Sequence, residues 1–377
     1  MKTDICDKLG IDVPIFAFSH CRDVVVAVSK AGGIGVLGAG TYTPEKLREE
    51  LDWIDAHIGD RPYGIDIVLP MKIPGMPDID DVDELTETLL AQVPQDYMDF
   101  AKNLLESHGV PEWDKDDPIK LIGWTEATTR PLFEEALTRD KANLIVSALG
   151  TPPKGMVDRA HVKGKLVGAL TGKPKHVESH KKAGVDIIIA NGAEGGGHVG
   201  EIGSIVLWPQ LVKAAHPLPV LAAGGIGSGE QIFAALAMGA QGVWTGSLWL
   251  TTEEASAEPA QKQSLLDATS DDTVVTRSWT GKRARVLNNK WNKIWESEYG
   301  LKPLYLPLQG LVTADAWRRT EKYAGVAQTQ DVALNIAGQV IGQINEIQSV
   351  RGVFERLLTE YADAAERMQA INKNLFD

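Results

Sequence analysis

The chain has 377 residues, enough for one large domain or two ordinary ones, and a core of this size needs no disulfide or metal. A net charge of −13 disfavours nonspecific binding to nucleic acid or to an anionic membrane. The two cysteines, Cys6 and Cys21, form no metal-ligand pattern, so we expect a protein of the reducing cytoplasm. Glycine is in excess, with 37 residues where a usual share of about 7% would give about 26.

Eight short apolar runs follow one another along the chain, with helix-like segments between most of them. The runs cover residues 13–18, 33–40, 63–70, 141–150, 164–170, 184–192, 218–225 and 240–250. The helix-like segments are 44–57, 131–140, 175–183, 204–215 and 229–238. Continuous β-branched runs are typical of strands buried on both faces of a parallel sheet. The alternation predicts an α/β protein, with a (β/α)8 TIM barrel as first choice and a doubly wound sheet as the alternative.

Two regions depart from this rhythm. Residues 71–140 are acidic and punctuated by proline, which predicts an inserted helical segment, either a lid over one barrel face or a solvated elaboration. Residues 251–377 form a C-terminal extension with a strongly helical end at 335–374, expected to pack on the barrel core of residues 1–250 as a helical subdomain. The uncharged window 232–250 is long enough to cross a bilayer, but its glycines and polar residues favour a buried helix, turn and strand.

A glycine-rich turn follows the seventh run, in the sequence VLAAGGIGSG of residues 220–229. Gly224 and Gly225 end the expected strand, and residues 227–229 open a helix whose free amides can hold an anion. The next strand ends in Gly246 and Ser247. Two successive strand ends of this kind predict the phosphate site of a TIM barrel, with plain tight turns as the alternative. The spacing is not that of a dinucleotide-binding fingerprint.

A second glycine-rich loop, NGAEGGGHVG at residues 191–200, follows the sixth run. Such bare backbone can press against a flat ligand, and Asn191 offers a donor and an acceptor at the strand tip. His198 lies within this loop, where a proton acceptor or donor is useful, although a loop-bracing histidine is the alternative. We expect Glu194 to hold backbone amides rather than to act as a base. At the end of the first run, backbone groups of Ala17 and Phe18 could face a ring.

With these motifs, the chain resembles the nitronate monooxygenase family, formerly called 2-nitropropane dioxygenases, whose members are FMN-containing TIM barrels. The stretches that carry the resemblance are residues 14–19, 29–40, 64–67, 143–153, 183–200, 219–247, 307–313 and 337–339. The stretches 183–200 and 219–247 are specific, whereas the others alone would be weak. The resemblance therefore covers most of the chain outside 71–140 and much of 251–300.

The resemblance implies roles for the matching positions. His198 falls on the proposed catalytic base, and Asn191 and Gly196 fall on positions that contact the flavin. The phosphate cradle falls on Gly224, Gly225, Gly246 and Ser247. Asp66 stands where the family usually has an asparagine near the flavin, Asn191 replaces a glutamine, and Gly195 replaces an alanine. An ionised Asp66 would lack the amide donor and would repel an anionic flavin or nitronate.

The resemblance implies an FMN-dependent oxidoreductase that oxidises alkyl nitronates with O2 to a carbonyl compound and nitrite. The alternative is an NAD(P)H-dependent flavin reductase or dehydrogenase that acts on an enone, a quinone or an acyl-CoA. A flavin- or phosphate-binding module without chemistry is a third hypothesis. The expected partners are a small-molecule substrate, with NAD(P)H or O2, and a second copy of the chain in a homodimer. Nucleic acid, membrane and metal are not expected.

Overall fold

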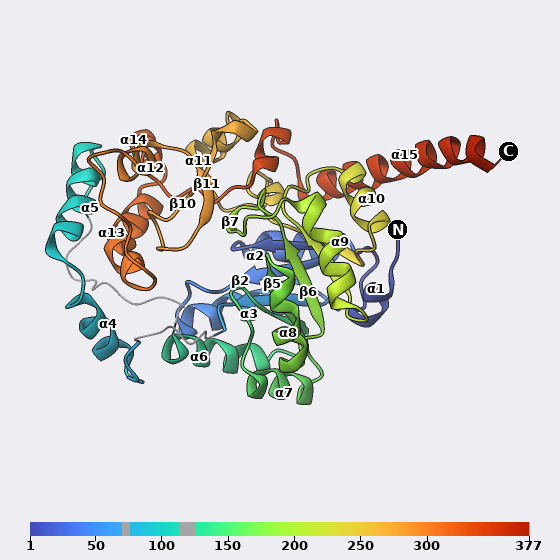
Figure 1. The fold of residues 1–377 in the computed structure, drawn as a ribbon, viewed down its shortest axis with the longest axis horizontal. Helices are drawn as coiled ribbons and strands as arrows, with labels where there is room; N and C mark the ends of the chain where they lie inside the picture. The colour runs from blue at the N-terminus through green and yellow to red at the C-terminus, as the bar shows by residue number, and fades with distance from the viewer. Residues whose placement is uncertain (70–75, 113–124, 377) are drawn as a thin grey trace.

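Eight parallel strands close into a barrel in the order β1–β2–β3–β4–β5–β6–β8–β9 (Figure 1). The computed structural model describes residues 1–69, 76–112 and 125–376. The barrel strands are β1 (Ile15–Ser19), β2 (Ile34–Gly38), β3 (Tyr63–Ile67), β4 (Ala142–Ser147), β5 (Leu166–Thr171), β6 (Ile187–Asn191), β8 (Val220–Ala223) and β9 (Gly242–Thr245). Six lie within the expected runs and β1 and β5 extend one residue beyond theirs, which confirms the predicted TIM barrel. The pairing of Ile15 in β1 with Val243 in β9 closes the ring and excludes the doubly wound sheet.

Both faces of the barrel strands are buried, which explains why their sequences are apolar without alternation. Within β1, Phe16 belongs to the cluster that fills the barrel interior, whereas its neighbours Ile15 and Ala17 pack against the outer helices. Helix α1 (Asp4–Leu9) adds Ile5 and Leu9 to the interior cluster and covers one end of the barrel. The opposite, carboxyl end of the strands is therefore the one available for a site.

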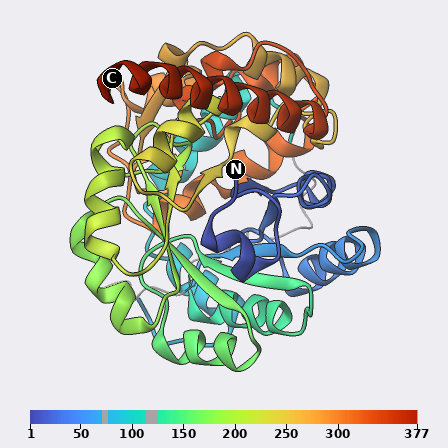
Figure 2. The same ribbon diagram turned by 90° about the vertical axis from the view of Figure 1, so that its right-hand side faces the viewer.

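The barrel helices surround the strands (Figure 2). They are α2 (Arg22–Lys30), α3 (Pro44–His57), α6 (Glu126–Leu137), α7 (Lys154–Val162), α8 (Val177–Ala183), α9 (Ser204–Ala215) and α10 (Gly229–Ala237). The bounds of α3 and α9 match the expected segments. The expectation that a helix begins at Pro131 is wrong, because Thr125 and Thr128 form a capping box that starts α6 five residues earlier.

Within the expected insertion 71–140, α4 (Val82–Leu90) and α5 (Gln95–Ser107) precede α6, while residues 71–75 and 113–124 lie outside the described residues. Figure 1 shows α4 and α5 beside the C-terminal helices, at a distance from the barrel strands. Leu104 of α5 packs with Trp291 and Val312, and Leu85 of α4 packs with Leu311. In contrast, α6 contacts β3 and β4 and is a helix of the barrel itself. The insertion and the C-terminal extension thus share apolar clusters.

The C-terminal extension contributes a small sheet of order β10–β11–β7, in which β7 (Gly197–His198) comes from the glycine-rich loop. Its other elements are β10 (Thr273–Thr276), β11 (Ala284–Leu287), α11 (Pro259–Leu266), α12 (Lys290–Trp295), α13 (Leu308–Lys322), α14 (Ala327–Gln330) and α15 (Val350–Phe376). The expected helix 335–374 is wrong in its first part, which holds only a short 3-10 turn at Gln339–Gln343. There, the amides of Gly338 and Gln339 bond to Ser247 Oγ and to the carbonyl of Glu194 instead of to a preceding helical turn.

The uncharged window 232–250 forms the end of α10, a turn, strand β9 and a 3-10 turn, as expected. In the part of the chain that the structure describes, no helix has both the length and the apolar character needed to cross a membrane.

Candidate functional site

The carboxyl end of the barrel gathers side chains from strands that are distant in the sequence. Because successive residues of a strand point to opposite faces, Phe18, Asp66 and Asn191 face the interior at the ends of β1, β3 and β6. Phe18 packs edge-on against His20, with ring centroids 5.1 Å apart. The side chain of Ala17 faces the outer helices, so only its backbone could meet a ligand in the barrel. The structure thus brings three of the predicted side chains to one end of the barrel.

Asp66 is a buried carboxyl group, with 4% of its surface exposed. Among the described residues its carboxyl has no hydrogen bond or ion pair, and burial alone raises its pKa well above the usual value. A neutral carboxyl presents one O–H donor and one carbonyl acceptor, as an amide presents a donor and an acceptor. The raised pKa favours this neutral form, whereas the expected lack of a donor and the expected repulsion of an anion belong to the ionised form.

Asn191 and Glu194 hold the second glycine-rich loop in place. The amide Nδ2 of Asn191 donates to the carbonyl of His198 over 2.9 Å. The carboxylate of Glu194 accepts from the backbone N–H of Ser204, at 2.9 Å, and from its hydroxyl, at 2.7 Å. Glu194 therefore holds a backbone amide, as expected, but this amide is that of the first residue of α9 and lies outside the loop 191–200. Asn191 links the end of β6 to the backbone of His198.

His198 lies in β7, where it pairs with Ala284 of β11. Its Nε2 is 2.9 Å from Oγ1 of Thr280, in the loop between β10 and β11. Burial, and next the charge of Lys282, lower the pKa of His198 to about 4. At neutral pH the imidazole is therefore uncharged: one ring nitrogen can accept a proton, and the other carries an N–H that can donate a hydrogen bond. The sequence did not reveal Thr280, which is 82 residues away and belongs to no motif.

The first glycine-rich turn is built as expected at Gly224 and Gly225, whose φ angles of 95° and 75° require glycine. The next amides, however, are already bonded within the protein. The N–H groups of Gly227 and Ser228 donate to Oε1 of Gln231, and that of Gly229 donates to Oε2 of Glu360 over 2.7 Å. The expectation that residues 227–229 offer free amides to an anion is therefore wrong, because a carboxylate of α15 occupies this helix end.

Ser247 and Gly196, two further predicted positions, contact the chain at Gly338. Ser247 Oγ accepts from the amide of Gly338 at 2.8 Å. A Cβ at Gly196 would lie 2.8 Å from the nitrogen of Gly338, so the close approach of two backbones accounts for glycine there. At Gly246, by contrast, a Cβ would meet only the Phe18 ring, 3.9 Å away, which leaves this position open toward the barrel mouth.

A cavity of about 710 Å³ lies between the loops after β1 and β2 and helix α13. It is lined by His20, Thr280 and Glu321, among others, and so reaches the loop that contacts His198. Nδ1 of His20 is 2.8 Å from the carbonyl of Gly38, and burial lowers the pKa of this histidine. Burial raises the pKa of Glu321. Sequence reasoning missed His20, although it comes directly after the first strand end.

A smaller cavity of about 390 Å³ lies beside Gly224 and Gly225. Glu194, Ser204 and Gln339 also line it, so the two glycine-rich turns and the segment after Gly338 meet there. Nowhere in residues 1–69, 76–112 and 125–376 do three or more His, Cys, Asp or Glu side chains form a group that could hold a metal ion.

Known proteins share this architecture over nearly their whole length. A sequence model of the nitronate monooxygenase family matches residues 5–360. The chain is 43% identical to Rv1533 of Mycobacterium tuberculosis, a protein named as a monooxygenase, over 98% of this chain and 99% of that one. It is 26% identical to a Staphylococcus aureus protein named as a nitronate monooxygenase, over 93% and 99% of the two chains.

Two solved structures resemble this chain over nearly its whole length. Nitroalkane oxidase from Streptomyces ansochromogenes matches with a TM-score of 0.78 and 25% identity, covering 97% of this chain and 99% of that one. FabK from Thermotoga maritima matches with a TM-score of 0.73 and 24% identity, covering 98% and 99%, and shares the fold. The chain therefore belongs to the nitronate monooxygenase family and is an oxidoreductase.

Proposed function

We propose that this protein is an FMN-dependent oxidoreductase that converts an alkyl nitronate and O2 into a carbonyl compound and nitrite. The observation that carries the proposal is the uncharged imidazole of His198, held by Thr280 at the carboxyl end of the barrel. An uncharged imidazole can take a proton, or its N–H can orient an anion. The family match over residues 5–360 supports the same reaction class.

Two features of the barrel mouth support the assignment of a flavin to it. Gly246 carries no side chain just past the end of β9, which leaves room beside Phe18, whereas at Gly38 the corresponding space is filled by Phe18 and His20. Asp66 offers a buried polar group that has no partner in the described part of the chain. We assign ring contacts to the backbone of Ala17 and to Phe18, Asp66, Asn191 and Gly196. A bound flavin would supply the electron-accepting chemistry that side chains lack.

We assign the phosphate to backbone amides at Gly224, Gly225, Gly246 and Ser247. The positive φ angles of the first two let the backbone approach an anion closely. The amides of residues 227–229 are left out of this assignment because Gln231 and Glu360 already bond them. The proposed phosphate site thus uses fewer backbone amides than the sequence motif predicted.

Thr280 and Lys282 of the C-terminal extension would act on the substrate together with His198 of the second glycine-rich loop. Thr280 fixes the orientation of the His198 imidazole through the 2.9 Å contact with Nε2. Burial, and next the positive charge of Lys282, lower the pKa of His198, and the same positive charge would favour an anionic substrate. We accordingly divide the chain into a barrel core of residues 1–250 and an extension of residues 251–377 that would complete the site. The helical insertion lies within 71–140, where α4 and α5 belong to it and α6 belongs to the barrel.

A second candidate is an NAD(P)H-dependent flavin reductase or dehydrogenase for an enone, a quinone or an acyl-CoA. The cavity of about 710 Å³ that Thr280 lines favours it, because a small alkyl nitronate needs far less room. In a dehydrogenation the uncharged His198 would accept the proton that leaves the substrate, whereas in a reduction the proton taken up by the substrate would have to come from solvent.

Anaerobic mixing experiments separate the two candidates. The purified protein should be yellow, and the released flavin should be FMN by chromatography. An alkyl nitronate should bleach the flavin absorbance, and in air should yield nitrite with O2 consumption. His198→Gln should lower this rate about 100-fold, whereas His57→Gln, an exposed histidine of α3, should not. Bleaching by NADPH or NADH but not by nitronates would reject the nitronate proposal in favour of the second candidate.

A further inference from the structure

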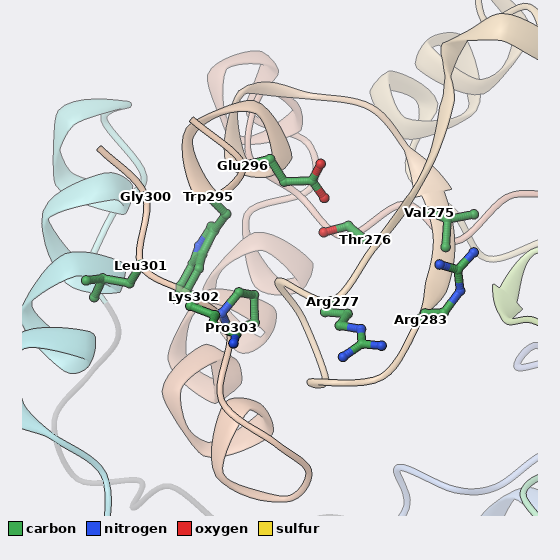
Figure 3. Close-up of a pocket in the computed structure, with 10 residues that line it drawn as sticks. All are labelled: Val275, Thr276, Arg277, Arg283, Trp295, Glu296, Gly300, Leu301, Lys302 and Pro303. Carbon is green, nitrogen blue, oxygen red and sulfur yellow. The ribbon is translucent and has the colours of Figure 1, made fainter. Parts of the chain in front are cut away.

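His20 is a polar residue at the barrel mouth that the proposed reaction does not use. It follows β1 directly and lines the cavity of about 710 Å³, together with Thr280 of the loop that contacts His198. Arg277 and Arg283, at the two ends of that loop, line a different cavity of about 410 Å³, which Figure 3 shows in close-up. The charges of these arginines therefore belong to the smaller cavity, whereas His20 and Thr280 belong to the larger one.

The imidazole of His20 is held in one orientation by its neighbours. Its Nδ1 is 2.8 Å from the carbonyl oxygen of Gly38, at the end of β2. The ring packs edge-on against Phe18, with an angle of 81° between the two ring planes. A Cβ at Gly38 would lie 2.8 Å from Nδ1, so the glycine makes room for the histidine. The hydroxyl of Tyr42 donates to the backbone carbonyl of His20 over 2.8 Å, which also fixes the backbone after β1.

The contact with Gly38 determines which nitrogen of His20 carries the proton. A carbonyl oxygen only accepts hydrogen bonds, so Nδ1 must be the donor. Burial lowers the pKa of His20, although the bond to Gly38 opposes the shift, and the uncharged ring is favoured at neutral pH. In that state Nε2 carries a lone pair, which the shape of the ring directs away from Gly38. No described residue forms a hydrogen bond with Nε2, so this lone pair is available to a molecule in the cavity.

The charged side chains around the same cavity are balanced in sign. They are three cations and three carboxyl groups: Arg22, Lys46, Arg318, Asp23, Glu50 and Glu321. Arg22 and Lys46 both contact Glu50, at 3.5 Å and 2.8 Å, so these charges are already paired within the protein. A cavity lined by balanced charges selects its ligand mainly by shape and by hydrogen bonds. The free acceptor on His20 is therefore well placed to contribute to specificity.

One wall of the cavity is apolar. Helix α13 contributes Leu311, Ala314 and Trp317, which are three residues apart and therefore share one face of the helix. Trp279, the residue before Thr280, also lines the cavity. An alkyl chain can pack along this wall, because burying its surface away from water is favourable. A ligand that fills the cavity and also donates to His20 thus combines an alkyl chain with an O–H group.

We propose that His20 is a specificity-determining residue that selects hydroxyalkyl nitronates, because its Nε2 accepts a hydrogen bond from the hydroxyl group of the substrate. A nitronate group offers only acceptors, so it has no hydrogen to give to Nε2, whereas a hydroxyl on the alkyl chain has one. A methyl group in the same place would leave the acceptor unpaired and would bind less well. The nitronate part of this inference rests on the proposed function, whereas the hydroxyl part rests on His20 and the cavity.

Matched pairs of nitronates test the proposal, with a terminal hydroxyl in one member and a terminal methyl in the other. The nitronates of 3-nitropropan-1-ol and 4-nitrobutan-1-ol are compared with those of 1-nitrobutane and 1-nitropentane. We expect the unmodified protein to prefer the hydroxyl member of at least one pair in kcat/KM, and this preference to fall about tenfold in His20→Asn. The asparagine amide can still donate to Gly38, but nothing replaces Nε2. The matched control is His57→Asn, an exposed histidine of α3 whose Nδ1 also contacts a backbone carbonyl, at 2.7 Å, and this variant should keep the preference.

Nitrogen-15 labelling of the histidine rings gives a second measurement that needs no turnover. The signals of His20, assigned by their loss in His20→Asn, should show a proton on Nδ1 and none on Nε2 at neutral pH. In flavin-loaded protein kept free of oxygen, the uncharged nitroalcohols should shift the Nε2 signal, whereas 1-nitrobutane and 1-nitropentane should not. If no nitronate is oxidised but an alcohol shifts this signal, the proposed function fails and the role of His20 in binding a hydroxyl stands.

The proposal is overturned if the unmodified protein distinguishes the members of neither pair, if His20→Asn keeps the full preference, or if the proton lies on Nε2. Loss of flavin absorbance from a folded His20→Asn variant would also overturn it, because Nε2 would then serve the cofactor and not the substrate. Thermal melting shows whether the variant is folded before its kinetics are interpreted.

Discussion

His198 should stay uncharged far below the pH at which most histidines titrate. Burial, and next the charge of Lys282, bring its pKa from 6.5 to about 4. At pH 5.5 about 97% of His198 should therefore be neutral, compared with about 9% of an unperturbed histidine. Catalysis that depends on the neutral imidazole should accordingly continue down to about pH 5 and fall only as the pH approaches 4.

The same shift links His198 to the stability of the fold. As the pH falls below 6.5, the unfolded chain takes up a proton at this position, but the folded chain does so only near pH 4. The free energy of unfolding should therefore decrease between pH 6.5 and pH 4, and this histidine should account for about 3 kcal/mol of the decrease. Above pH 6.5 it should contribute no pH dependence.

Two measurements test this reasoning. Carbon-13 labelling of the histidine rings allows the His198 signal to be assigned by its loss in His198→Gln and then titrated directly. Denaturant unfolding at several pH values, compared between the unmodified protein and His198→Gln, measures the linked stability. Lys282→Gln should raise the pH midpoint of the His198 titration, because it removes the second cause of the lowered pKa. A His198 signal with a midpoint near pH 6.5 would refute the reasoning.

Three further predictions concern single contacts. Thr280→Val should lower kcat/KM about tenfold because His198 loses its partner, and Thr280→Ser should restore it, as steady-state kinetics will show. Glu360→Ala should lower the free energy of unfolding by about 1–3 kcal/mol because the Gly229 amide loses its acceptor, whereas Glu355→Ala on the exposed face of α15 should not, in denaturant titrations. Asp66→Asn should retain the flavin, measured by absorbance, since both groups can donate; loss of the flavin would contradict a neutral Asp66.

The strands and the two glycine-rich turns could be predicted because their signals are local. A strand buried on both faces is apolar along most of its length, and all eight barrel strands coincide with such runs to within one residue. The positive φ angles of Gly224 and Gly225 likewise leave little choice of residue. Helix α6 and the segment 335–349 were predicted less well, because a capping box and long-range hydrogen bonds override the local pattern there.

The sequence by itself determined the eight-strand pattern, the bare backbone at the strand ends and the placement of His198 in a glycine-rich loop. Only the tertiary structure decided what those groups can do. Thr280, 82 residues away in the sequence, contacts His198. Glu360 of the last helix accepts from the amide of Gly229, which the motif had predicted to be free for a phosphate. Burial raises the pKa of Asp66 and so favours its uncharged form. Contacts between distant segments and the removal of water set these properties, and neither is encoded in the spacing of nearby residues.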